Sequence, residues 1–137
     1  MPRGQNCYMS DRVSITIDNG IADVRLTRAD KRNALDSEMF RAIAAAGERL
    51  KTQAGVRCVV LSGEGKSFCA GLDMGSMNQL AGAPPANGEE QTNAGDINDG
   101  SITHLAQQIC WVWQELPMPV ISAVHGHALG GGIQLAL

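Results

Sequence analysis

The sequence is poor in aromatic residues and in charge of either sign. Of its 137 residues only 4% are aromatic and 18% are charged, and 11 Lys plus Arg residues stand against 14 Asp plus Glu. The basic residues are scattered along the chain rather than gathered in a stripe. Because a nucleic-acid surface needs concentrated positive charge, no nucleic-acid partner is expected. The hydrophobic content of 44% is typical of one globular domain.

Signals for export, disulfide bonding and metal binding are also missing. The N-terminal stretch has no apolar run of the length that a secretory signal needs. The four cysteines are Cys7, Cys58, Cys69 and Cys110. They show no C-x-x-C spacing, so neither a zinc site nor a disulfide framework is expected, and a reducing cytoplasm fits best. His125 and His127 form an H-x-H pair without a recognisable third ligand, so no metal is expected.

Residues 116–137 contain no Asp, Glu, Lys or Arg, which is a property of membrane spans. Pro117, Pro119 and several glycines interrupt this stretch, however, and a continuous apolar helix would not contain them. We therefore expect a buried strand, a turn and a helix here, and no membrane partner.

Alternating apolar and polar residues predict a β-hairpin near the N-terminus. Its strands cover residues 13–18 and 21–28. Asn19 and Gly20 lie between them, and Asn-Gly is the dipeptide that a two-residue turn with positive φ prefers. Residues 1–12 are expected to form a flexible N-terminus.

The following residues predict a helix and then a buried strand. Asp36 or Ser37 can cap the helix, which is expected to end near Gly55. Its apolar residues at helical spacing are Met39, Phe40, Ile43, Ala44 and Leu50. The continuous apolar run 56–61 predicts a strand that is buried on both faces, as parallel strands are.

The rest of the chain repeats this alternation of helix and strand. Residues 81–100 are rich in Gly, Pro, Asn and Asp and predict a mobile surface loop. Helical periodicity returns over residues 102–116, residues 119–124 predict another buried strand, and the glycines 130–132 open a further helix. The order β, β, α, β, α, β, α predicts an α/β fold, whose functional sites lie at the carboxyl ends of its strands.

Two segments at such strand ends are candidates for a site, residues 66–74 (KSFCAGLDM) and residues 126–132 (GHALGGG). Small residues let a ligand approach the backbone, so the N–H groups of Leu72 and Gly131 could bind one oxygen atom. Two such donors form an oxyanion hole, which lowers a reaction barrier by about 3–4 kcal/mol per donor. A glycine cluster alone is also a common packing turn, and this one matches neither the dinucleotide nor the nucleotide-phosphate fingerprint.

With these segments the sequence resembles the enoyl-CoA hydratase/isomerase family, also called the crotonase superfamily. Three motifs carry the resemblance: Asn33-Ala34-Leu35, residues 67–73 (SFCAGLD) and residues 119–132 (PVISAVHGHALGGG). The resemblance implies a crotonase-like spiral of ββα units, with mostly parallel buried strands and flanking helices. Family members continue for about as long again, so residues 13–137 are expected to be the N-terminal half of such a domain.

The resemblance implies an acyl-CoA substrate and no separate cofactor. The thioester carbonyl would lie between the N–H groups of Leu72 and Gly131, which would stabilise an enolate. The implied coenzyme A contacts are Lys31, Arg32, Ala34, Ala70, Asp73, Met74 and Gly130. Lys31 and Arg32 could equally be a solvated loop pair, and Asp73 is expected to cap a turn rather than act as a base.

One position departs from the family's pattern. The hydratases of the family carry a catalytic glutamate two residues after the glycine run, where this chain has Gln134. An amide does not transfer protons near neutral pH. The second catalytic carboxylate of the family would lie beyond Leu137. We therefore expect an isomerase or a divergent lyase rather than a standard two-glutamate hydratase.

Two alternatives to an active enzyme remain open. The protein could bind acyl-CoA or assemble with relatives without chemistry of its own. The chain could also be an inactive fragment, because residues 133–137 end in apolar helix without the usual stop residues. For the full-length protein the resemblance implies a homotrimer or hexamer.

Overall fold

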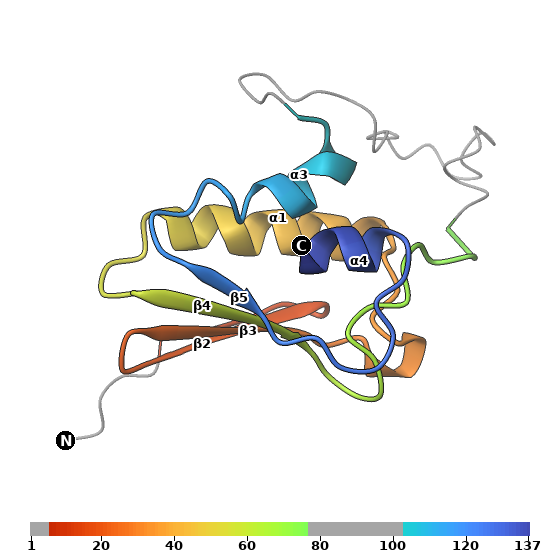
Figure 1. Ribbon diagram of the computed structural model, residues 1–137, viewed down its shortest axis with the longest axis horizontal. Coiled ribbons are helices and arrows are strands. Elements are labelled where there is room, and N and C mark those ends of the chain that lie inside the picture. The colour runs from red at the N-terminus through yellow and green to blue at the C-terminus, as the bar shows by residue number, and fades with distance from the viewer. Residues whose placement is uncertain (1–5, 77–102) are drawn as a thin grey trace.

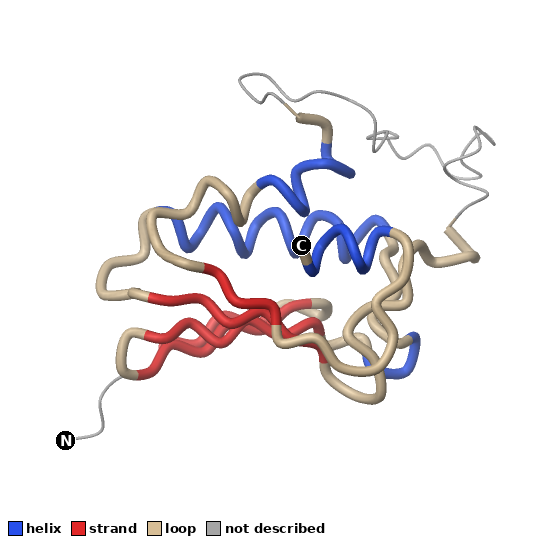
Figure 2. Tube along the Cα trace, in the orientation of Figure 1, coloured by secondary structure: helices blue, strands red, loops and turns tan. Residues whose placement is uncertain are grey.

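The computed structural model describes residues 6–76 and 103–137. Within these ranges the chain forms a mixed five-stranded sheet in the order β1-β2-β3-β4-β5, with helices over one face (Figures 1 and 2). The strands are β1 (Asn6–Met9), β2 (Val13–Asp18), β3 (Ile21–Leu26), β4 (Cys58–Gly63) and β5 (Val120–Ser122). The helices are the short 3₁₀ helix η1 (Ala29–Lys31), α1 (Ser37–Lys51), α3 (Leu105–Trp111) and α4 (Gly131–Ala136). The predicted α/β class is confirmed.

The sheet is antiparallel on one side and parallel on the other. β1 pairs with β2 and β2 with β3 in antiparallel fashion, whereas β3–β4 and β4–β5 are parallel. Residues 6–9 correct the expectation of a flexible N-terminus over residues 1–12, because their backbone groups pair with the outer edge of β2. The carboxyl ends of β3, β4 and β5 consequently meet at one end of the sheet, where three loops begin.

Two local predictions are confirmed. The hairpin between β2 and β3 turns at Asn19 and Gly20, whose φ angles are 49° and 83°. Asp36 caps α1, since its Oδ1 accepts a hydrogen bond of 2.8 Å from the N–H of Met39.

The bounds of the later elements differ from the predictions. β4 extends to Gly63 because each of its residues, from Cys58 onward, pairs with β3, so its bounds follow the register rather than the apolar run 56–61. α3 ends at Trp111, after which the N–H of Gln114 bonds to the carbonyl three residues back. Tightened turns of this kind commonly end a helix. The loop predicted over residues 81–100 lies outside the described residues.

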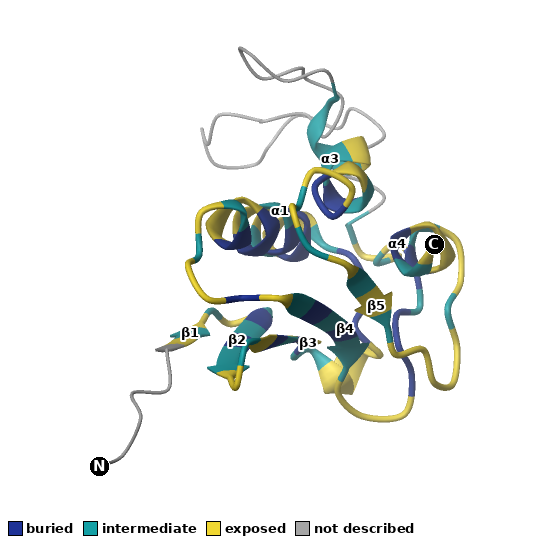
Figure 3. Cartoon of the chain, turned by 60° about the vertical axis from the view of Figure 1, so that its left-hand side comes forward, coloured by how far each residue is buried: buried dark blue, intermediate teal, exposed yellow. Residues whose placement is uncertain are grey.

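The core lies between α1 and the sheet (Figure 3). The buried residues of α1 are Met39, Phe40, Ile43, Ala46, Gly47 and Leu50. They face the fully buried side chains of alternate strand residues, which include Val13, Ile15, Val24, Leu26, Val59 and Leu61. β5 was expected to be buried, but it is the last strand of the described sheet and Ile121 is 55% exposed.

Residues 116–137 contain β5, a loop and α4 and do not form one continuous apolar helix. No helix in the described ranges has both the length and the apolar character needed to cross a membrane.

α1 and α3 approach each other closely at Gly47. A Cβ atom at this position would overlap both γ-methyl groups of Val112. Alanine is favoured over glycine by about 1 kcal/mol within a helix, whereas an overpacked methyl group costs about 1–3 kcal/mol. We therefore expect Gly47→Ala to lower the free energy of unfolding by up to about 2 kcal/mol in urea titrations. In a Val112→Ala background the same substitution should stabilise the protein, and stabilisation of the unmodified chain by Gly47→Ala would contradict the packing described.

Candidate functional site

The loops that follow β4 and β5 lie side by side at the carboxyl end of the sheet (Figure 1). The first covers residues 64–73 and the second covers residues 123–130. Three backbone hydrogen bonds join them: Phe68 N to His125 O (2.8 Å), Cys69 N to His127 O (3.1 Å) and Leu129 N to Cys69 O (3.1 Å). The structure thus brings together the two segments that the sequence singled out.

A third segment, residues 32–36, lies along the other side of the first loop. Its backbone bonds are Ala70 N to Arg32 O (2.9 Å), Leu35 N to Gly71 O (2.8 Å) and Asp73 N to Leu35 O (3.0 Å). The last two form a parallel bridge between Leu35 and Leu72. Because successive residues of an extended chain direct their N–H groups to opposite sides, the N–H of Leu72 points away from Leu35. It therefore faces the side on which the second loop lies.

The backbone N–H groups of Leu72 and Gly131 both lie at this junction. Among the residues that the structure describes, the N–H groups of Leu72 and Gly131 have no hydrogen-bond acceptor. Gly131 is the first residue of α4, where N–H groups have no intrahelical partner. By contrast, the N–H of Asp73 bonds to Leu35 O, and that of Gly132 bonds to Leu129 O at 2.8 Å. Two unbonded donors at one junction can bind an oxygen that acquires negative charge.

Glycine permits the close approach of these segments. Gly71 has a φ of 89°, and a Cβ atom there would lie 2.7 Å from the carbonyl oxygen of Leu129. A Cβ atom at Gly132 would overlap the carbonyl oxygen of Cys69. Side chains at either position would push the first loop and α4 apart, so the glycines set the spacing between Leu72 and Gly131.

The side chain of Asn33 binds backbone carbonyl groups of the first loop and holds that loop in place. Asn33 is fully buried, and its Nδ2 lies 3.0–3.1 Å from the carbonyl oxygens of Glu64, Ser67 and Phe68. Its Oδ1 accepts a hydrogen bond of 2.9 Å from the N–H of Arg28. Asn33 has a φ of 56°, a left-handed conformation that asparagine tolerates better than most residues.

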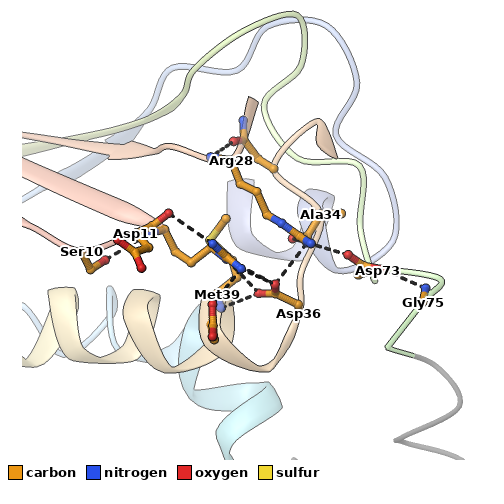
Figure 4. A network of polar contacts seen from close by, with 11 residues as sticks. Ser10, Asp11, Arg28, Ala34, Asp36, Met39, Asp73 and Gly75 are labelled. Atoms are coloured by element: carbon orange, nitrogen blue, oxygen red, sulfur yellow. Dashed lines mark hydrogen bonds and ion pairs between the residues drawn. The ribbon is translucent and has the colours of Figure 1, made fainter. Parts of the chain in front are cut away.

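An ion-pair network joins these segments to the start of α1 (Figure 4). Arg28 Nη1 lies 2.6 Å from Asp73 Oδ2 and 3.3 Å from Asp36 Oδ2, and it donates to Ala34 O at 3.1 Å. Asp36 also binds the guanidinium of Arg12, with 2.9 Å between Nη2 and Oδ2. The side chains of Arg28, Asp36 and Asp73 are each less than a fifth exposed.

Both carboxylates of this network have a lowered pKa. The hydrogen bond from Arg28 is the largest cause for Asp73, followed by the N–H of Gly75, which donates to Oδ1 at 2.8 Å. For Asp36, burial is the largest single cause and acts to raise the pKa, but the hydrogen bonds from Arg12 and from the N–H of Met39 outweigh it together with the positive charges of Arg28 and Arg12. Both groups are therefore carboxylates near neutral pH, and neither is poised to act as a general base.

The remaining predicted residues surround this junction. Lys31, Arg32, Met74 and Gly130 are exposed, and Ala34 and Ala70 are half-buried. Asp73 caps the turn that follows it through Gly75, as its position in the sequence suggested. Gln134 is exposed in the first turn of α4, and its backbone N–H bonds to Gly130 O at 3.4 Å.

The two histidines of the second loop contact the first loop. His125 Nε2 lies 2.8 Å from Gly65 O, and His127 Nδ1 lies 3.3 Å from the buried hydroxyl of Ser67. Arg32 Nη1 donates to the same hydroxyl at 3.4 Å. In residues 6–76 and 103–137 no three His, Cys, Asp or Glu side chains are grouped in a way that could hold a metal ion. Cys69 is buried, which raises the pKa of its thiol, so packing rather than nucleophilic attack suits it.

Arg28 was not recognised from the sequence as a member of the site, and Asn33 was recognised only as part of the Asn33-Ala34-Leu35 motif, without a role for its side chain. The Arg28–Asp73 pair joins residues that lie far apart in the chain, so no local pattern reveals it. Asn33 had a weak signal, since an isolated asparagine between two polar connections can adopt positive φ.

A separate cleft of about 260 Å³ lies between α3, β5 and α4. Its lining residues are Cys110, Trp113, Gln114, Leu116, Met118, Pro119, Val120, Ser122, Leu135 and Leu137. Neither Leu72 nor Gly131 belongs to this lining, so the cleft and the pair of N–H groups are distinct features.

Comparisons with known proteins show which family this sequence matches. The family model for enoyl-CoA hydratase/isomerase matches residues 16–137. YngF of Bacillus subtilis (strain 168) is 34% identical over 131 residues, which cover 94% of this chain and 45% of that protein. The human mitochondrial Delta(3,5)-Delta(2,4)-dienoyl-CoA isomerase is 33% identical over 128 residues, which cover 93% of this chain and 38% of that protein.

Solved structures agree with these sequence matches. The structure of Pseudomonas aeruginosa PA4980 aligns with a TM-score of 0.73 at 30% identity, over 93% of this chain and 51% of that chain. A crystal structure of an enoyl-CoA hydratase/isomerase family member aligns with a TM-score of 0.71 at 29% identity, over 91% of this chain and 44% of that chain. The chain therefore spans about half the length, or less, of these relatives.

Replacement of the Asn33 amide by a carboxylate tests its structural role. Asn33→Asp keeps the shape of the side chain but places an acceptor opposite three carbonyl oxygens, so we expect the free energy of unfolding to fall by about 3 kcal/mol or more. Asn19→Asp is the matched control, because Asn19 also has positive φ but is exposed. It should change the free energy by less than about 1 kcal/mol in the same urea titration. Equal effects at the two positions would contradict the role given to Asn33.

Proposed function

The chain belongs to the enoyl-CoA hydratase/isomerase family, and we propose that it binds an acyl-CoA thioester through the N–H groups of Leu72 and Gly131. Both groups would donate to the thioester carbonyl oxygen. When a proton leaves or joins the carbon chain, the carbonyl becomes an enolate, and the two donors would stabilise the negative charge on its oxygen. The observation that supports this role most strongly is that both N–H groups lack an acceptor among the described residues, while the N–H groups of the residues that follow them, Asp73 and Gly132, are bonded.

Charge near the site supports coenzyme A as the rest of the ligand. Lys31 and Arg32 are exposed, and the carbonyl of Arg32 is bonded to Ala70 in the first loop. Two cations at the same end of the sheet as the paired N–H groups suit the phosphates of coenzyme A. Ala34, Ala70, Asp73, Met74 and Gly130 adjoin the junction and would contribute backbone contacts.

The glutamine at position 134 favours an isomerase reaction, in which the double bond of the acyl chain moves, over hydration of that double bond. Addition of water needs one group to activate the water and another to protonate carbon, whereas an isomerase can move one proton with a single base. An amide at position 134 supplies neither role. The same observation supports a second candidate function, the binding of acyl-CoA without chemistry.

The proposal also covers the cellular compartment and the oligomeric state of the full-length protein. The cysteines Cys7, Cys58, Cys69 and Cys110 are free thiols, which is consistent with a reducing cytoplasm. A homotrimer or hexamer is the assembly that the family suggests for the full-length protein.

Deletion of one donor tests the binding site. Gly131→Pro removes the N–H at the first position of α4, where proline is well tolerated, and Gly131→Ala keeps the N–H while adding a similar Cβ. An added Cβ would lie 2.8 Å from Leu35 Cδ1, the end of a flexible side chain. Calorimetry would compare butanoyl-CoA with S-butyl-CoA, a thioether without the carbonyl. We expect the unmodified chain and Gly131→Ala to bind butanoyl-CoA more tightly than S-butyl-CoA. In Gly131→Pro the ratio of these two affinities should fall about fivefold, which corresponds to the loss of one hydrogen bond. Equal affinities of the unmodified chain for the two ligands would contradict the proposed site.

Two substrates separate the candidate reactions. In the full-length protein with Gln134 intact, where the carboxylate expected beyond Leu137 would be the single base, we expect 3-enoyl-CoA to be converted to 2-enoyl-CoA faster than 2-enoyl-CoA is hydrated, as followed by absorbance of the conjugated thioester. Hydration as the faster reaction would refute the preference for isomerisation. Tight acyl-CoA binding with neither conversion would instead support the binding function.

A further inference from the structure

We infer that Arg28 is a positioning residue that fixes the direction of the Leu72 N–H, an inference that rests on the proposed function of that group. Arg28 lies two residues after β3, directly before η1, and does not belong to either loop of the site. Its guanidinium acts on Leu72 through the residues on both sides of the Leu35–Leu72 bridge.

The contacts of one nitrogen atom span this bridge. Arg28 Nη1 donates to Ala34 O at 3.1 Å, and Ala34 immediately precedes Leu35. The same Nη1 lies 2.6 Å from Oδ2 of Asp73, which immediately follows Leu72. Arg28 therefore holds the two bridged segments together at one point, as Figure 4 shows.

The residues next to Leu72 are held more firmly than Leu72 itself. Gly71 O accepts from the N–H of Leu35 at 2.8 Å, and the N–H of Asp73 donates to Leu35 O at 3.0 Å. The Asp73 carboxylate binds Arg28 through Oδ2 and the N–H of Gly75 through Oδ1. Leu72 is 44% exposed and makes no backbone bond of its own among the described residues, so its orientation depends on these neighbours.

The ion pair is sheltered enough to hold this geometry. The side chain of Arg28 is 15% exposed and that of Asp73 is 17% exposed, so neither has the rotational freedom of a surface pair. Arg28 is held in turn by Asp36, whose other partner is Arg12. A group displaced by about 1 Å from its working position can cost about a hundredfold in rate, so small movements at Leu72 matter.

Arg12 provides a matched control for Arg28. Both guanidinium groups bind Asp36 Oδ2, at 2.9 Å for Arg12 and 3.3 Å for Arg28. Arg12 also pairs with Glu38 on α1. No contact between Arg12 and Ala34 or Asp73 is present in the described part of the chain, so Arg12 supports the same network without touching the bridge.

The test measures how strongly the bound thioester carbonyl is polarised. Butanoyl-CoA labelled with ¹³C at the carbonyl would be added at saturation to the 137-residue chain, and the carbonyl stretch recorded by isotope-edited infrared spectroscopy. Donation of hydrogen bonds lowers this frequency relative to the free ligand. We expect the unmodified chain and Arg12→Gln to show the full shift and Arg28→Gln to lose most of it.

Asp73→Asn is a second variant that removes the negative charge of Asp73 from the ion pair and leaves Arg28 bound to Ala34 and Asp36. It should also lose most of the shift, and it decides the outcome if Arg28→Gln does not fold. A full shift in folded Arg28→Gln or in Asp73→Asn overturns the inference while leaving the proposed function intact. If Arg12→Gln loses as much of the frequency shift as Arg28→Gln, the inference is also overturned. The ion-pair network would then affect the site only by stabilising the fold. Absence of a shift in the unmodified chain contradicts the proposed function itself, and the inference with it.

Discussion

The buried amide of Asn33 is the contact on which the geometry of the site depends. Its Nδ2 binds carbonyl oxygens of the loop after β4, and its Oδ1 binds the backbone at the end of β3. Because these groups are shielded from water, no solvent molecule can replace the amide without cost. The loop after β4 is thereby fixed between two neighbours, and the Leu72 N–H emerges from it on the side of α4.

The ion pairs of Arg28 and two glycines also help to fix the geometry of the site. Arg28 joins the capping carboxylate of α1 to the residue that follows Leu72, so the start of the helix and the site share one network. Gly71 and Gly132 let the loop and α4 approach within contact distance of each other's carbonyl groups. The two unbonded N–H groups are thus held by backbone and buried polar contacts, and only small movements are left to them. Such preorganised donors lose little energy in reorientation when charge develops on a ligand.

Local features of the fold were predictable because they depend on residues that are close in sequence. Asn19-Gly20 requires positive φ wherever it joins two strands, and Asp36 caps the helix that begins one residue later. The pairing of residues 6–9 with β2 was missed, since an edge strand needs little apolar pattern of its own. In the site, the small residues and motifs around Leu72 and Gly131 were visible in the sequence. The contact of Arg28 with Asp73 and those of the Asn33 amide with the first loop were not, because they join segments separated by about thirty residues or more.

The central claim is that the N–H groups of Leu72 and Gly131 bind one thioester oxygen, and amide proton NMR observes both groups directly. Resonances of the ¹⁵N-labelled chain would be followed during titration with butanoyl-CoA and, separately, with free coenzyme A. A hydrogen bond to the carbonyl should move the Leu72 and Gly131 amide protons downfield with butanoyl-CoA only. If neither amide moves, or if free coenzyme A moves both by the same amount, the two N–H groups do not form the thioester site.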